Sequence, residues 1–197
     1  MSGAPAAAIL AGGRARRFGG VAKGLELVGG ERIVDRVIAA VREVASDVVL
    51  VGAAPAVAAT LPGLTVIADE APGVGPLGGI LSALRATGRD TLVVAWDMPF
   101  VSADELRPLL AVSDDADVVA WEAEGRVEPL CTLYRATAAS PLRGAFAAGD
   151  RSPREALRCL RVHLVRHADS GRPYPFTSVN TPQQLDAARR ASSATGR

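Results

Sequence analysis

The sequence predicts an α/β fold in which one sheet of mostly parallel strands lies between two layers of helices. Over the first two-thirds of the 197 residues, short segments that are apolar throughout alternate with segments whose apolar residues recur at the helical period. Strands that are apolar on both faces are typical of parallel sheets covered on both sides. Twenty glycines and 13 prolines supply the turns that this alternation requires.

The elements of the first two-thirds follow in order. Residues 6–11 (AAAILA) form an apolar strand that ends at two glycines, and residues 33–44 form a helix with apolar residues on one face. Residues 47–51, 64–68 and 91–96 are predicted to be buried strands because they are short and apolar. A helix over 76–86 begins with proline, whose fixed φ suits a first turn. The next helix begins at Ser102, and Glu105 gives it the spacing of a capping box.

The last third of the chain has a different pattern. Residues 117–121 and 127–134 flank an acidic, glycine-containing turn at 122–126, which predicts an antiparallel excursion of the sheet. Ser152 with Glu155, and Thr181 with Gln184, have the spacing of two further capping boxes. The sequence has no internal repeat and no low-complexity linker. We therefore expect a single three-layer α/β/α, Rossmann-like domain over residues 1–197.

The composition excludes several classes of protein. A formal net charge of +1 excludes a strongly basic protein that coats nucleic acid, and 4% aromatic residues argue against a base-stacking surface. The N-terminus has no basic segment before its apolar run, and that run is too short to cross a membrane. Cys131 and Cys159 form no C-x-x-C pair, which favours reduced thiols. We expect a cytoplasmic protein with neither a nucleic-acid nor a membrane partner.

A glycine-rich, basic loop follows the first predicted strand. It reads LAGGRARRFGGVAK over residues 10–23. Ligands of α/β sheets bind beyond the carboxyl ends of the strands. Glycines let backbone amides approach a phosphate chain. Arg17 and Lys23 add positive charge: arginine can contact a phosphate through two N–H groups at once, and lysine through its single ammonium. The structural alternative is a basic surface loop.

Two better-known phosphate motifs, G-x-x-x-x-G-K-[ST] and G-x-G-x-x-G, do not occur in this loop. The pattern L-A-G-G-x-x-x-R-[MF]-G-G-x-x-K instead resembles the signature loop of enzymes that transfer a nucleoside monophosphate to a cofactor or sugar phosphate. Within that family, L-A-G-G resembles the molybdenum cofactor guanylyltransferases, whereas L-A-A-G marks their cytidylyltransferase relatives.

Asp97 directly follows the predicted strand at 91–96 and precedes Met98 and Pro99. A carboxylate at the carboxyl end of a strand faces the same edge as the first loop. Magnesium is often held by one or two carboxylates together with substrate phosphates. A turn-forming aspartate is the alternative. The resemblance implies a metal ligand, since D-x-P after the fourth strand binds the metal ion of the family.

Asp69 and Asn180 carry two further parts of the resemblance. Residues 69–80 resemble D-x(n)-G-P-L-[AG]-G-[IM], in which the aspartate helps to hold the nucleotide; an ordinary loop carboxylate is the alternative. Residues 176–182 (FTSVNTP) resemble F-x-N-x-N-T-P, where Asn180 matches the second asparagine and Ser178 replaces the first. The strand at 47–51 also departs from the family, because its end is apolar where an asparagine is common.

The resemblance implies transfer of GMP from GTP to the terminal phosphate of molybdopterin, with release of pyrophosphate and with Mg²⁺ as cofactor. It implies three catalytic residues: Lys23 at the α-phosphate, Arg17 at the β- and γ-phosphates, and Asp97 at the metal. The nucleotide would be held by Leu10, Ala11, Gly12, Gly13, Lys23, Asp69 and Asp97, and the acceptor by Asn180. Residues 1–115 would form a nucleotide-binding half and residues 116–191 an acceptor-binding half. Transient contact with other molybdenum cofactor biosynthesis proteins is also expected.

Three alternatives stay open on the sequence. Two of them are enzymes, a cytidylyltransferase for the same pterin and a sugar-phosphate nucleotidyltransferase. A regulatory module could bind a nucleotide without turnover. The presence of Arg17, Lys23 and Asp97 together favours an enzyme, because a sensor would not need all three.

Overall fold

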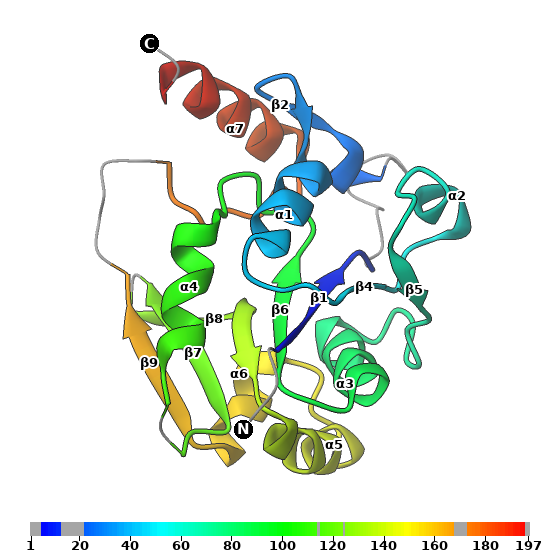
Figure 1. The fold of residues 1–197 in the computed structure, drawn as a ribbon, viewed down its shortest axis with the longest axis vertical. Helices are drawn as coiled ribbons and strands as arrows, with labels where there is room; N and C mark the ends of the chain where they lie inside the picture. The colour runs from blue at the N-terminus through cyan, green and yellow to red at the C-terminus, as the bar shows by residue number, and fades with distance from the viewer. Residues whose placement is uncertain (1–4, 13–21, 114, 124, 168–172, 196–197) are drawn as a thin grey trace.

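The computed structural model describes residues 5–12, 22–113, 115–123, 125–167 and 173–195. At its centre is a seven-stranded sheet in the order β5-β4-β1-β6-β8-β7-β9 (Figure 1). The strands are β1 (Ala6–Leu10), β4 (Val48–Val51), β5 (Thr65–Ile67), β6 (Thr91–Ala95), β7 (Val118–Ala123), β8 (Arg126–Tyr134) and β9 (Val162–Arg166). Helices cover both faces of this sheet, so the predicted α/β fold is confirmed.

The strand order places a switch point between β1 and β6. Strands β5, β4, β1 and β6 are parallel to one another, β8 is antiparallel to both β6 and β7, and β9 is parallel to β7. The chain runs from β1 outward to β4 and β5 and then returns to place β6 on the other side of β1. The predicted antiparallel excursion is thus β8. Ligands of open α/β sheets bind where the strand order reverses, beyond the strand ends.

The two helical layers pack on opposite faces of the sheet. Helices α1 (Ile33–Arg42) and α4 (Ala103–Ala111) share one apolar cluster with Ile9 of β1. Helices α3 (Pro76–Thr87), α5 (Ala139–Ala147) and α6 (Pro153–Ala156) share another with Leu10. Neighbouring residues of β1 therefore face different layers and both are buried, which explains why this strand is apolar throughout.

A small hairpin and the last helix pack together at the end of the molecule opposite the N-terminus (Figure 1). Strands β2 (Leu27–Val28) and β3 (Glu31–Arg32) pair antiparallel, and α7 (Pro182–Thr195) lies against them. Their shared apolar cluster consists of Val28, Ile33, Val179, Leu185 and Ala188. The guanidinium Nε of Arg189 on α7 donates a hydrogen bond to the carbonyl of Leu27 at 3.0 Å.

The remaining helical segments are short. They are η2 (Lys23–Leu25), α2 (Pro55–Ala58), η3 (Ala136–Ala138) and η4 (Leu157–Cys159). Neither these segments nor the β2–β3 hairpin is predicted from the sequence, because each has too few residues to show a periodic pattern.

Strand β5 corrects the prediction of a buried strand at residues 64–68. It lies at the edge of the sheet, and Thr65 and Val66 are exposed. The three predicted capping boxes also differ. Ser102 and Glu105 form theirs, whereas Ser152 makes no capping hydrogen bond through its side chain. At α7, the Gln184 N–H donates to Thr181 Oγ1 at 3.2 Å, while the Gln184 side chain accepts from Asn180 N at 2.8 Å.

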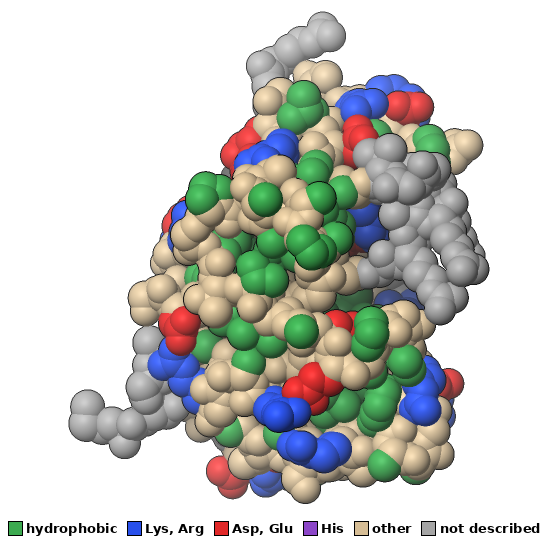
Figure 2. Space-filling view, turned by 90° about the vertical axis from the view of Figure 1, so that its right-hand side faces the viewer, with side chains coloured by type: hydrophobic (Ala, Val, Ile, Leu, Met, Phe, Trp, Pro, Cys, Tyr) green, Lys and Arg blue, Asp and Glu red, His purple; other side chains and the backbone are tan. Residues whose placement is uncertain are grey.

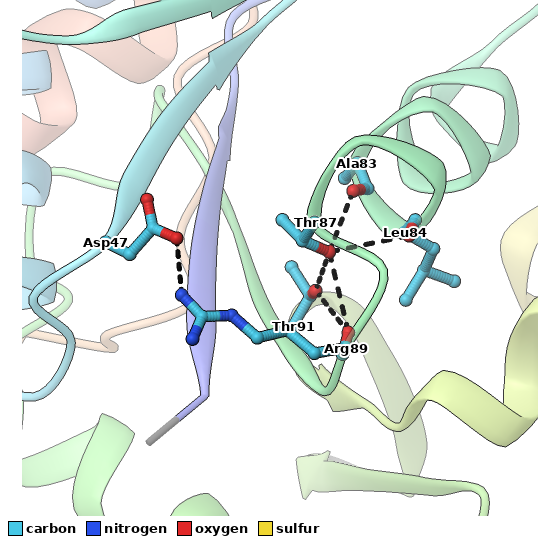
Figure 3. Close-up of polar contacts among 6 residues, drawn as sticks. All are labelled: Asp47, Ala83, Leu84, Thr87, Arg89 and Thr91. Atoms are coloured by element: carbon cyan, nitrogen blue, oxygen red, sulfur yellow. Dashed lines mark hydrogen bonds and ion pairs between the residues drawn. The ribbon is translucent and has the colours of Figure 1, made fainter. Parts of the chain in front are cut away.

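The connection from α3 to β6 is fixed by polar contacts at the amino end of β6 (Figure 3). Thr87 Oγ1 donates to the Ala83 carbonyl at 3.0 Å and lies 2.6 Å from Thr91 Oγ1. Arg89 pairs with Asp47, which directly precedes β4. These contacts join α3, β4 and β6 at the amino ends of the strands. The switch-point loops lie at the opposite, carboxyl ends and take no part in them.

Figure 2 shows the face of the molecule on the β5 side of the sheet, where acidic and basic side chains lie beside one another and hydrophobic side chains are scattered between them. Val66 of β5 is an exposed apolar residue of the chain, as is Leu164 of β9 at the other edge of the sheet. Among the residues that the structure describes, no helix has the length and apolar character needed to cross a bilayer.

Candidate active site

A cavity of about 420 Å³ opens at the switch point. Its lining comes from the carboxyl ends of β1, β4 and β6, the middle of β8, the start of α3, and the segment before α7. The lining residues are Leu10, Gly12, Lys23, Val51, Asp69, Gly73, Gly75, Pro76, Gly79, Ala95, Trp96, Asp97, Leu130, Ser178 and Asn180. A cavity of this size, with few polar groups among apolar walls, is typical of small-molecule sites.

Lys23 places its ammonium between two oxygens of this cavity. Its Nζ forms an ion pair with Oδ2 of Asp97 and donates a hydrogen bond to Oδ1 of Asn180 at 2.6 Å. Asp97 is 4% exposed, and its carbonyl accepts a hydrogen bond from Val179 N at 2.9 Å. The end of β6 and the segment before α7 are therefore joined beside Lys23. This residue is also the only lysine among the 22 lysines and arginines of the chain.

Gly24 fixes the position of the segment that carries Lys23. A Cβ atom at Gly24 would lie 2.3 Å from the ring of Trp96, so only glycine allows this close approach. Trp96, which follows β6 and precedes Asp97 in the chain, is buried at 5% exposure. Its Nε1 is buried without a hydrogen-bond partner among the described residues. The residue after the lysine therefore packs against the residue before the aspartate, and this contact brings the two segments together.

Gly12 and Asp69 meet on the other side of the cavity. An ideal Cβ on Gly12 would lie 3.8 Å from the Gly52 carbonyl and 3.9 Å from Oδ2 of Asp69, which are ordinary contacts. The other carboxylate oxygen of Asp69, Oδ1, accepts a hydrogen bond from Ala71 N at 2.9 Å. This bond closes a turn, orients the carboxylate and leaves Oδ2 toward Gly12. Gly52 has a φ of +73°, a left-handed conformation that favours glycine and brings its backbone beside Gly12.

The structure places most of the sequence-predicted site residues around this one cavity. Leu10, Gly12, Lys23, Asp69, Asp97 and Asn180 line it, as does Ser178, the residue that departs from the motif. Ala11 is buried beside them at 6% exposure and packs in the core. Gly13 and Arg17 lie outside the described residues.

The motif quoted at 69–80 contains Gly75 and Gly79, whereas Gly73 and Leu130 were not identified as lining residues from the sequence. Gly73, Gly75 and Gly79 belong to the segment that opens α3, where residues 73–78 do read G-x-G-x-x-G, after β5 rather than after β1. Gly75 has a φ of +117°, which explains the glycine at this N-cap. Leu130 lies inside β8. Pro129 is its signal in the sequence, because proline inside a strand indicates a bulge or an edge.

The oxygen atoms around Lys23 also fit a divalent cation. A carboxylate oxygen and an amide oxygen lie within contact of the same positive charge. Such hard oxygens are the ligands that Mg²⁺ prefers, and Mg²⁺ usually completes its shell with water and substrate phosphates. Within the described part of the chain, no group of three or more His, Cys, Asp and Glu residues could hold a metal. A cation here would therefore depend on few protein ligands.

The chain is similar to known proteins over most of its length. It is 36% identical to the molybdenum cofactor guanylyltransferase of Cereibacter sphaeroides over 189 residues, which cover 90% of this chain and 91% of that one. It is 38% identical over 162 residues to a probable molybdenum cofactor guanylyltransferase of Chloroflexus aggregans, with coverage of 77% and 76%.

A solved structure has the same fold and a similar sequence. The molybdopterin-guanine dinucleotide biosynthesis protein A of Archaeoglobus fulgidus superposes with a TM-score of 0.76 at 28% identity and covers 95% of this chain and 98% of its own. The model of the MobA-like NTP transferase domain matches residues 7–170, a span that includes the first loop, Asp69 and Asp97. The chain is therefore a nucleotidyltransferase that belongs to the MobA-like NTP transferase family.

Proposed function

We propose that this protein is a molybdenum cofactor guanylyltransferase, which transfers GMP from GTP to the terminal phosphate of molybdopterin and releases pyrophosphate. The observation that carries the proposal is that the Lys23 ammonium contacts oxygens of both Asp97 and Asn180 at the switch point of the sheet. The names of the relatives, molybdenum cofactor guanylyltransferases, support the choice of nucleotide and acceptor. This reaction produces the guanine dinucleotide form of the cofactor.

The chemistry requires little from acid–base catalysis. A phosphate oxygen of the acceptor attacks the α-phosphorus of GTP, the bond from that phosphorus to the bridging oxygen breaks, and pyrophosphate leaves with the electron pair. A phosphate monoester with a second pKa of about 6 is mostly ionised at neutral pH, so the nucleophile needs no general base. The site must instead align two anions and neutralise their charge.

The residues of the proposed site divide this task. Lys23 contacts the α-phosphate, where a point charge stabilises the negative charge that develops in the transition state. Asp69 and the backbone around Gly12 hold the guanosine. Asn180 lies on the acceptor side. Arg17 neutralises the leaving β- and γ-phosphates, and Leu10, Ala11 and Gly13 complete the nucleotide-binding loop.

Asp97, with the Asn180 oxygen beside it, would hold Mg²⁺. Bound there, the ion supplies Lewis-acid stabilisation of the phosphates and a template for their alignment. With the ion bound, Lys23 would have to leave these oxygens, and the α-phosphate would give its ammonium a new anionic partner.

The same proposal assigns functions to the two halves of the chain. Residues 1–115 bind the nucleotide, and residues 116–191 bind the pterin. We place the reaction in the cytoplasm. We also propose that another protein of molybdenum cofactor biosynthesis delivers the acceptor through a transient contact.

The test is pyrophosphate release by the purified protein with Mg²⁺, molybdopterin and each of the four nucleoside triphosphates. We expect release with GTP, strict dependence on molybdopterin, and a guanine dinucleotide product in the mass spectrum. A preference for CTP would make the protein a cytidylyltransferase. Pyrophosphate release with a sugar phosphate in place of molybdopterin would make it a sugar-phosphate nucleotidyltransferase. Tight GTP binding without turnover would indicate a regulatory module.

Asp97→Asn tests the proposed role of Asp97 as a ligand of Mg²⁺. The variant should keep its fold and its GTP affinity in the absence of metal but lose Mg²⁺-dependent turnover, because a neutral amide binds a hard dication poorly. Circular dichroism and Mg²⁺ titration of the rate measure the two properties. Wild-type activity at ordinary Mg²⁺ concentration would remove Asp97 from the site.

A further inference from the structure

Strand β8 contains a bulge where it passes the cavity. Ala120 of β7 lies opposite Thr132, but the next residue, Trp121, lies opposite Glu128. The three residues between them, 129–131, therefore have no opposite residue in β7. On the other side, the pairing of β8 with β6 ends where Val94 lies opposite Cys131. The bulge therefore lies beside the carboxyl end of β6, the strand that leads to Asp97.

Side chains bind the polar backbone groups of the bulge. Oε1 of Glu128 accepts a hydrogen bond from Leu130 N at 2.9 Å. The fully buried Tyr134 donates from Oη to the Pro129 carbonyl at 2.9 Å, and Thr132 Oγ1 donates to the Glu128 carbonyl. Arg154 Nε donates to the Val127 carbonyl at 2.9 Å. Since each bond fixes one peptide group, the backbone of the bulge is held in one conformation.

Glu128 is a costly residue at this position. Its side chain is 16% exposed, and its closest described cation is Arg154 at 4.0 Å. Burial raises the pKa of the Glu128 carboxyl, and the Asp97 charge raises it further, whereas the Leu130 N–H and Arg154 lower it. A charged carboxylate that is partly removed from water near a second carboxylate destabilises the folded protein unless it makes a compensating contact. The hydrogen bond to Leu130 N is such a contact.

The fixed bulge places Leu130 in the wall of the cavity. Leu130 is half-buried and lines the cavity together with Ser178 and Asn180. These three are the cavity residues that come from the acceptor-binding half, and Leu130 is the apolar one among them. Bulges near active sites serve to aim a side chain that a regular strand would direct elsewhere.

We propose that Leu130 is a specificity-determining residue for the acceptor, as an apolar wall against its pterin ring system, and that Glu128 is the positioning residue that holds Leu130 there. The inference rests on the proposed function for the identity of the acceptor. Glu128 acts through the hydrogen bond to Leu130 N and does not touch either substrate.

The test compares Leu130→Ala, Glu128→Ala and Glu128→Gln with the wild type. Leu130→Ala should raise the KM for molybdopterin about tenfold or more, as loss of an apolar wall does, while the Kd for GTP in calorimetry stays within about twofold. Glu128→Ala should shift the same KM in the same direction. Glu128→Gln keeps an oxygen that can accept from Leu130 N, so it should restore most of the lost affinity. Val127→Ala, a truncation on the same strand away from the cavity, is the matched control.

The outcomes separate the possible roles. A wild-type KM for molybdopterin in Leu130→Ala, or an equal loss of GTP affinity, would overturn the inference. An effect of Glu128→Gln as large as that of Glu128→Ala would assign the role to the charge and not to the hydrogen bond. If Glu128→Ala does not fold, Leu130→Ala and Glu128→Gln still decide. Absence of molybdopterin-dependent turnover in the wild type would refute the proposed function itself, whereas unaffected variants of an active wild type refute this inference alone.

Discussion

At the scale of single residues, Lys23 differs from every other cation of the chain. Of its 22 lysines and arginines, all but this one are arginines. Arginine offers a planar fork, whereas lysine offers a compact point charge that three hydrogen-bond acceptors can share. The Lys23 ammonium already contacts two oxygens, from Asp97 and Asn180. In the proposed complex with Mg²⁺ and GTP, a phosphate oxygen would take their place as its partner.

Lys23→Ala should therefore lower kcat on the order of 100-fold or more while GTP affinity changes little, because the lost charge acts mainly on the transition state. The same variant should bind Mn²⁺ or Mg²⁺ more tightly in the absence of nucleotide, because the ammonium no longer occupies the oxygens of Asp97 and Asn180. Steady-state kinetics and Mn²⁺ titration followed by electron paramagnetic resonance measure the two effects.

Lys23→Arg is the matched control for charge. Its planar group is too wide to replace a point contact, so we expect it to recover little of the rate. If Lys23→Ala raised KM and left kcat unchanged, Lys23 would be a uniform binding contact and its catalytic role would be wrong. Unchanged metal affinity would show that the lysine and the cation use different positions.

Gly12 is the residue on which the preference for GTP over CTP is expected to depend. Alanine fits there, because the new Cβ would meet Gly52 and Asp69 at 3.8 and 3.9 Å and Gly12 needs no left-handed φ. The methyl group would narrow the space beside the Asp69 carboxylate that a purine requires. A clash of one methyl group is worth about 1–3 kcal/mol, so the GTP preference should fall roughly 10- to 200-fold.

The ratio of kcat/KM for GTP and CTP in the wild type and in Gly12→Ala measures this effect. Gly30→Ala is unsuitable as a control, because Gly30 has a φ of +85° and alanine would be strained there. Gly144→Ala is suitable, since a Cβ there would meet nothing within 4 Å among the described residues outside its own helix backbone, and its φ is ordinary. An unchanged ratio in a folded Gly12→Ala protein would place base selection elsewhere.

At the scale of elements, the position of Asn180 depends on the packing of α7 against the β2–β3 hairpin. Lys23 lies just before this hairpin and Asn180 just before α7, and the two elements share the cluster of Val28, Val179 and Leu185. Arg189 adds hydrogen bonds to the Leu27 carbonyl and to Glu26. The contact between Lys23 and Asn180 therefore joins segments that the packing of α7 holds together.

Leu185→Ala should loosen this packing. Truncation of a buried leucine typically costs about 2–5 kcal/mol, and the small size of this cluster favours the lower end of that range. We expect faster hydrogen exchange over α7, a lower melting temperature and a higher KM for the acceptor. Gln183→Ala, on the exposed side of α7, should change none of these. Unchanged exchange over α7 in Leu185→Ala would show that the helix does not depend on this cluster.

The same elements show what the sequence could predict. The long elements α1, α3, β1 and β6 follow from periodicity and from continuous apolar runs, and the loops after β1 and β6 carry recognisable site residues. The β2–β3 hairpin has two residues per strand, too few for a pattern. The exposure of β5 depends on its place at the sheet edge, which strand composition does not encode. The role of Leu130 depends on a bulge that only strand register shows.

At the scale of the whole molecule, one sheet passes through both proposed halves, so the acceptor side is built on the same framework as the nucleotide side. Asp117, just before β7, makes several hydrogen bonds within residues 116–191, the half proposed to bind the acceptor. Its carboxylate accepts hydrogen bonds from Arg161 Nε at 3.0 Å, Arg161 Nη2 at 2.9 Å and Thr137 Oγ1 at 2.8 Å. These bonds connect β7 with the segments before β9 and around η3.

The hydrogen bonds from Arg161 and Thr137 hold the pKa of the Asp117 carboxyl well below its ordinary value, although burial opposes the shift. A carboxyl whose pKa is lowered by folding stabilises the protein above its unfolded pKa of about 3.9, and that contribution is lost as the pH falls toward the folded value. Asp117→Asn should thus reduce the free energy of unfolding at pH 7 by about 1–2 kcal/mol, a modest cost because the Arg161 side chain is 64% exposed.

Urea denaturation of the wild type and Asp117→Asn between pH 7 and pH 3 measures the difference as a function of pH. It should be constant down to about pH 4 and should narrow below it, because only the wild type then gains a proton on unfolding. Asp104→Asn is the matched control: its carboxylate also pairs with an arginine, Arg107, but is 68% exposed, so its removal should cost less than about 0.5 kcal/mol at every pH. A difference for Asp117→Asn that stays constant to pH 3 would mean that the amide fails for steric reasons and that the charge of Asp117 does not stabilise the acceptor half.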